Sequence, residues 1–172
     1  MCLCVVIGGL AAMGGTSWLI FSNVEADQVN VAESSEAIAD YSLPAGFGDG
    51  HAVSIAGFSL VSYTGDDGHS HIYLMQAPSG LTVDEELLER RMREATGSNE
   101  WAEITVVERQ PCTIRGKETT LVISEGMNHD GERYRSASGV FEGNGGLALV
   151  NISTPSESWD QEMVDTFIES LR

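Results

Sequence analysis

The chain has 172 residues, 42% of them hydrophobic, which suits one domain with a packed core plus accessory segments. Its net charge of −17 excludes a protein that binds a nucleic-acid backbone, because such a protein needs a basic surface. Eight of the nine basic residues lie between Arg90 and Arg135, and no Lys or Arg precedes them. An acidic balance of this kind favours solubility and cationic partners.

The first segment, residues 1–21, is apolar and has no charged side chain. As a helix it would be about 30 Å long, which matches the hydrocarbon core of a bilayer. Trp18 lies near its end, where an interfacial aromatic ring is expected. A cleaved signal peptide would start with Lys or Arg and end in small residues, whereas this segment has no basic start and bulky residues near its end. We therefore predict an uncleaved transmembrane anchor whose partner is the lipid bilayer.

The orientation of this anchor follows from the acidic stretch behind it, which is most easily left outside the cell. The prediction is a single-pass protein of the cell membrane with an extracytoplasmic C-terminal domain. Small residues recur in the anchor at helical spacing and would let two such helices approach each other, so a homodimer through the anchor is a further expectation. These small residues are Gly8, Ala11, Ala12 and Gly15.

Residues 22–40 are polar and acidic without apolar periodicity, which predicts a flexible linker. The stretch YSLPAGFGDG then begins the folded domain, residues 41–172, with an extended approach, a proline and a Gly-rich turn. Of the three cysteines only Cys112 lies in this domain, so no disulfide can form within it. The domain must therefore be held by core packing.

The first part of the domain predicts two strands and a helix. Residues 51–63 alternate like one strand, and a parity shift at Gly57 predicts a β-bulge. Residues 71–76 predict the second strand. The helix is predicted over residues 81–97 and ends at Gly97. Its capping box is Thr82 and Glu85, and its apolar positions are Leu88, Met92 and Ala95.

The second part predicts further strands joined by tight turns, and a last helix. Residues 101–109 alternate, and CTIRGKETTLVIS predicts a hairpin with its turn at Gly116–Lys117. Two strands follow, over residues 132–142 and 147–153. The closing helix has a capping box at Ser158 and Gln161 and core positions at Trp159, Met163, Val164, Phe167, Ile168 and Leu171.

Strands joined by tight turns must pair antiparallel, and two amphipathic helices must cover the resulting sheet. The predicted fold is therefore α+β: an antiparallel sheet in a helix–sheet–helix sandwich, behind an N-terminal transmembrane helix. Three stretches, YSLPAGF, TIRGKETTLV and WDQEMVDTFIESLR, together with this order of elements, resemble the fold shared by the PsbP extrinsic photosystem proteins and a Ran-binding nuclear import factor.

The resemblance covers about residues 40–172. Bacterial relatives of this type often face the envelope behind an N-terminal anchor or lipid signal. The resemblance implies a role in binding or assembly more than in catalysis, and it assigns no site residue to this chain.

Histidines in turns are the strongest candidates for chemistry. The stretch TGDDGHSHIYLMQ places Asp67 near His69 and His71, whose spacing puts both rings on one side of a strand. With His129 from the turn NHDGE, these residues would make a site for Zn²⁺ or a similar divalent ion. The same residues also suit a tight turn, and no HExxH, CxxC or EF-hand pattern accompanies them. A turn is therefore the first interpretation and a metal site the alternative.

The sequence contains no GxSxG, GxGxxG or P-loop motif. The Gly-rich FEGNGGLAL joins two predicted strands and so predicts a hairpin loop, and Cys112 is expected to be a half-buried filler and not a nucleophile. We expect no catalytic residue, and no cofactor other than the divalent metal of the alternative. The predicted function is a membrane-anchored, envelope-facing domain that binds a protein or small ligand or assists assembly. The alternatives are a metal-binding domain and an enzyme whose site forms only in three dimensions.

Overall fold

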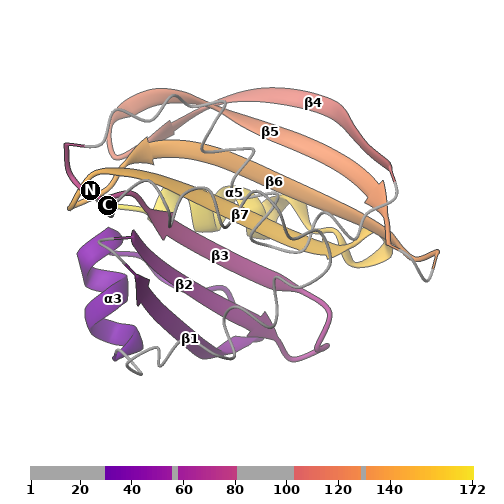
Figure 1. Cartoon of the computed structure of the whole chain (residues 1–172). Coiled ribbons are helices and arrows are strands. Elements are labelled where there is room, and N and C mark those ends of the chain that lie inside the picture. Colours follow the sequence, from indigo (N-terminus) through magenta and orange to yellow (C-terminus); the bar gives the residue numbers. More distant parts are fainter. Residues whose placement is uncertain (1–29, 56–57, 81–102, 129–130) are drawn as a thin grey trace, which may run out of the picture.

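The chain is described by a computed structural model (Figure 1). Its described residues are 30–55, 58–80, 103–128 and 131–172. They form a seven-stranded antiparallel sheet, two α-helices and a short 3-10 helix. The predicted anchor and the helix predicted over 81–97 lie outside these residues. Among the helices of the described ranges, none is long and apolar enough to cross a membrane.

The sheet is antiparallel throughout, as predicted. Its first three strands are β1 (Phe47–Ile55), β2 (Phe58–Gly65) and β3 (His71–Gln76). Its last four are β4 (Glu103–Ile114), β5 (Lys117–Met127), β6 (Arg133–Glu142) and β7 (Leu147–Pro155). The strands lie side by side in the order β1-β2-β3-β7-β6-β5-β4, so the chain leaves the middle of the sheet after β3 and returns at its far edge (Figure 1).

The prediction of one bulged strand over residues 51–63 was wrong. Ile55 pairs with Phe58, and Val53 with Leu60, so the chain reverses here and forms two strands. The parity shift near Gly57 has a simple reason, because the residues before and after it belong to different strands. Their side chains nevertheless lie on the same face of the sheet.

The strand predicted over 101–109 is longer than expected and continues through Pro111 to the end of β4. Proline is tolerated there because β4 is an edge strand. The register of β4 shifts between Val106 and Glu108, and Ile114 pairs with Lys117. The turn residues are therefore Arg115 and Gly116, with φ of 54° and 76°, as in a type I′ turn. The predicted turn was one residue too late.

Helix α3 (Val31–Ile38) is part of the stretch predicted as a flexible linker, so that prediction was wrong for these residues. Ser34 and Ile38 are buried, and the Asn30 side chain accepts a hydrogen bond from Ala32 N at 3.0 Å as the N-cap. The helix is too short, and its buried side too small, to show apolar periodicity in the sequence.

Three hydroxyl groups fasten α3 to the sheet. The Ser35 Oγ lies 2.9 Å from the Tyr63 hydroxyl of β2, and the Tyr41 hydroxyl donates to Ser35 Oγ at 2.8 Å. The two tyrosine hydroxyls are 2.8 Å apart. Burial raises the pKa of Tyr41, with Ser35 opposing this rise and Tyr63 adding to it, so the phenol stays protonated.

Helix α5 (Gln161–Ser170) confirms the predicted closing helix, but its N-cap differs. The Asp160 carboxylate accepts hydrogen bonds from Glu162 N at 3.0 Å and Met163 N at 3.2 Å. The predicted cap, Ser158, instead ends the 3-10 helix η2 (Ser156–Ser158).

The larger cluster of core residues lies on one face of the sheet, which we call the first face. Both described helices pack there, and α5 lies behind the sheet in the view of Figure 1. Tyr41 contacts the Phe167 ring edge-on, with 5.7 Å between ring centroids. The largest fully buried side chains on this face are Phe167, Ile38, Ile72, Leu74, Ile114, Leu121, Ile123, Ile152 and Val61.

The Gly-rich stretch forms the β6–β7 hairpin loop, as predicted, and it also caps α3. Asn144 donates from its backbone to Ile38 O at 2.8 Å and from its side chain to Glu36 O at 2.7 Å. Gly145 N donates to the Gln76 Oε1 at 2.9 Å. The loop therefore satisfies carbonyl groups that the end of a helix leaves without partners.

Candidate functional site

The second face of the sheet, opposite the two described helices, carries two rows of uncharged polar side chains. Residues paired across neighbouring strands point to the same face, so the register defines these rows. One row is Thr64, His71, Ser153, Ser136 and Ser124, and the next is Ser62, Tyr73, Asn151 and Ser138. We call these residues the hydroxyl band.

The hydroxyl band is partly buried. Ser136 and Asn151 are 7% and 8% exposed, and the other members are half-buried. Asn151 Nδ2 donates to Ser138 Oγ at 2.8 Å. Ser136 lies between Ser124 and Ser153 in the first row, and its hydroxyl can both donate and accept a hydrogen bond, so it is a candidate ligand contact.

His71 and Tyr73 form the aromatic part of the band. Their rings are stacked with centroids 5.8 Å apart, and His71 Nδ1 lies 3.5 Å from Thr64 Oγ1. Burial lowers the pKa of His71 below its usual value, while the Asp67 carboxylate opposes this shift and His69 adds to it. Burial also raises the pKa of Tyr73. Both rings are therefore neutral at pH 7.

Beside the band, the second face is apolar. Met75, Val140 and Leu149 form a small buried cluster, against which Leu60 packs. The pairings of Leu60 with Met75, Met75 with Leu149, and Leu149 with Val140 place this cluster in the row next to Ser62 and Tyr73. The second face thus has an apolar half and an uncharged polar half.

Of the predicted metal ligands, Asp67 and His69 lie in the turn between β2 and β3, and His71 is the first residue of β3. The Asp67 Oδ1 accepts hydrogen bonds from His69 N at 2.9 Å and Ser70 N at 2.8 Å, and its Oδ2 accepts from Ser70 Oγ at 2.6 Å. Its carboxylate therefore holds the β2–β3 turn together. Partial burial raises the pKa of Asp67, but the bonds from Ser70 and His69 outweigh it, and the pKa is lowered.

His69 is exposed in that turn, whereas His71 belongs to β3 and the hydroxyl band. No three His, Cys, Asp or Glu side chains of the described ranges lie close enough to hold a metal ion. His129 lies outside the described residues. The metal site therefore stays a prediction.

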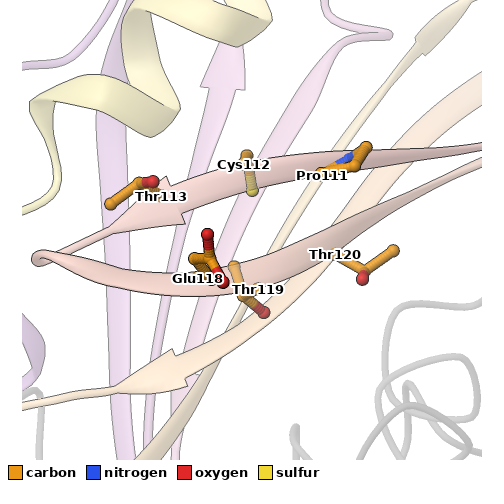
Figure 2. A pocket seen from close by; sticks show the side chains of 6 residues that line it. All are labelled: Pro111, Cys112, Thr113, Glu118, Thr119 and Thr120. Carbon is orange, nitrogen blue, oxygen red and sulfur yellow. The ribbon is translucent and has the colours of Figure 1, made fainter.

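A shallow depression of about 380 Å³ lies on the β4–β5 hairpin (Figure 2). Its lining side chains are Pro111, Cys112 and Thr113 from β4 and Glu118, Thr119 and Thr120 from β5. Burial raises the pKa of the Cys112 thiol, the backbone of Leu121 opposes this, and Asp165 adds to it. A protonated thiol is a poor nucleophile, so this depression has no activated group for catalysis.

The hydroxyl band was missed in the sequence because its members come from five strands. Each strand carries only a short signal, in which two polar residues flank a side chain that points into the core. Examples are Ser136-Ala137-Ser138 in β6 and Asn151-Ile152-Ser153 in β7, where Ala137 and Ile152 are fully buried. Only the register shows that these pairs form continuous rows.

Neither a protein-family model nor a curated protein matches the chain. Among solved structures, the solution structure of cyanobacterial PsbP (CyanoP) from Synechocystis sp. PCC 6803 aligns with a TM-score of 0.57 and 16% identity. The alignment covers 80% of this chain and 88% of that chain. The chain therefore has the PsbP-like fold that the sequence resemblance implied. Identity at this level shows the fold alone.

A crystal structure of a protein of unknown function from Pseudomonas aeruginosa also aligns, with a TM-score of 0.38 and 12% identity. That alignment covers 71% of this chain and 74% of the other. At this score it carries no argument about function.

Proposed function

We propose that the chain is a membrane-anchored, non-catalytic binding domain that faces away from the cytoplasm and contacts its ligand with the hydroxyl band. The band carries this proposal because it gathers neutral donors and acceptors from five strands. Sites for small ligands typically place a few polar groups beside apolar surface, as the second face does. In contrast, the thiol of Cys112 is protonated and unsuited to attack a substrate.

The membrane part of the proposal is supported by the uncharged apolar run of residues 1–21. In membrane fractions washed with alkaline carbonate, the full chain should remain with the lipid. Recovery in the soluble fraction, or a mature N-terminus close to Phe21, would contradict the anchor.

The binding function is tested by thermal melts of the full chain with a panel of chemically distinct probes: a neutral oligosaccharide, a basic peptide and an anionic polysaccharide. Only a probe that binds the native state raises the melting midpoint. The rise should be lost when Ser62 and Ser153 of the band become alanine. The matched control replaces Ser54 and Ser59, which are paired on the first face, and should keep the rise. A rise that persists in the band variant would contradict the proposal.

A further inference from the structure

The chemistry of the hydroxyl band restricts the ligand that it fits. The band crosses the sheet from β2 through β3, β7 and β6 to β5. At roughly 4.8 Å between neighbouring strands, it is about 19 Å long, and it is two residues wide. On β4 the first row meets Val106, which pairs with Ser124. The second row continues from Ser138 through Val122 of β5 to Arg109 of β4. The long dimension suits an extended ligand.

Charge excludes several classes of ligand. The chain has a net charge of −17, so its field repels polyanions. The side chains of the band are uncharged at pH 7, and the carboxylate nearest along its rows belongs to Asp49 of β1, which pairs with Thr64 at the end of the first row. An apolar ligand would bind better to the neighbouring row of Met75, Leu149 and Val140. The ligand class that remains is polar and uncharged.

The donors and acceptors of the band point to hydroxyl groups on the ligand. Each serine and threonine hydroxyl can both donate and accept a hydrogen bond, as the hydroxyl of a sugar can. Asn151 uses one N–H for Ser138, while its carboxamide has further donor and acceptor capacity. The Ser136 hydroxyl, in the first row between Ser124 and Ser153, has the same capacity to donate and accept.

Tyr73 lies in the middle of the second row, between Ser62 and Asn151, and His71 stacks on it. Aromatic rings of this kind combine an apolar body with a polar tip. They therefore offer an apolar surface for the C–H groups of a sugar ring while the neighbouring hydroxyls bind its edge. We propose that the ligand of the hydroxyl band is an uncharged oligosaccharide, an inference that rests on the proposed binding function of the band.

The test is isothermal titration calorimetry on the full chain, in a zwitterionic detergent that has no sugar headgroup. The probes are maltohexaose and chitotetraose, both uncharged, with tetralysine and a heparin-derived oligosaccharide as charged comparisons. At least one neutral probe should bind. Removing the Ser62 and Ser153 hydroxyls deletes two neutral hydrogen bonds and should weaken binding about tenfold or more. The control variant at Ser54 and Ser59 should bind like the unaltered chain.

The outcomes separate this inference from the function on which it rests. If neither neutral probe binds, while tetralysine binds and the band variant weakens it, the band is a binding face and the sugar assignment is overturned. If no probe binds at concentrations up to about 10 mM, where Kd values reflect only a few kcal/mol, the sugar assignment is also overturned. If a neutral probe binds equally to both variants, the band is not its site, and the proposed function fails as well.

Discussion

The β6–β7 loop makes a sharp prediction about stability, because Gly143 has no room for a side chain. A Cβ at this position would overlap Gln76 Oε1, lie 2.9 Å from the backbone oxygen of Ile38 and lie 3.0 Å from the Cβ of Ala148. Gln76 is itself buried, and Ile38 O belongs to the end of α3. The Gly143→Ala substitution must therefore move the loop away from both the helix and the sheet.

The expected cost has two parts. Forcing a methyl group into a packed site typically costs about 1–3 kcal/mol. Displacing Gln76 also weakens the hydrogen bond that Gly145 N donates to its side chain at 2.9 Å, which contributes about 0.5–1.5 kcal/mol. We therefore expect Gly143→Ala to lower the free energy of unfolding by about 2–4 kcal/mol. In a chain of this size the melting temperature should fall by roughly 4–16 °C.

Urea unfolding of the full chain at constant temperature measures this loss as a lower midpoint with an unchanged slope. Gly48→Ala is the matched control, because a Cβ there meets no atom within 4 Å, and its stability should stay within about 0.5 kcal/mol. Adding Gln76→Ala to Gly143→Ala should cost less than the sum of the two single changes, since one obstacle is removed. An unchanged midpoint for Gly143→Ala would refute the close approach of this loop to α3.

Three further predictions concern other contacts. Tyr63→Phe removes the hydroxyl that meets Ser35 and Tyr41, and it should lower the free energy of unfolding by about 1–2 kcal/mol in urea; a loss below about 0.3 kcal/mol would mean that these bonds do not hold α3. His71 has a lowered pKa when folded, so the unfolded chain takes up its proton first as the pH falls through about 6.5, and stability drops there. The His71→Gln chain should lose less stability than the unaltered chain between about pH 7.5 and 5.5; equal losses in the two chains would contradict the burial of His71. If the predicted metal site forms, zinc should raise the melting midpoint saturably, and the rise should vanish in His69→Ala; no rise with zinc would remove the site.

Local patterns predicted the parts of the fold that depend on neighbouring residues. Alternating strands and tight turns gave the antiparallel sheet, and the spacing of Val164, Phe167 and Ile168 gave α5, where all three are buried. The same kind of pattern led to a wrong prediction for residues 51–63, because a β-bulge and a hairpin turn both interrupt the alternation of apolar and polar residues in the same way. Pairing of Val53 with Leu60 decides between them, and pairing is not visible in one strand alone.

Features that rest on distant contacts could not be predicted. Helix α3 is held by Tyr63 and by Asn144, which is far away in sequence, so residues 31–38 resemble a linker when they are considered alone. The hydroxyl band has the same origin, since Ser62, Ser136 and Ser153 become neighbours only through β3, β7 and β6. Conversely, the turn around Asp67 was predictable, because its hydrogen bonds all lie within three residues.

The central claim, that the hydroxyl band is the binding face, is tested most directly by amide chemical shifts of the isotope-labelled full chain during titration with the neutral oligosaccharides. The account predicts that the largest changes occur at residues 62–64, 71–73, 136–138 and 151–153, where the band crosses four of its strands. Changes confined to residues 111–120, at the β4–β5 depression, would contradict it.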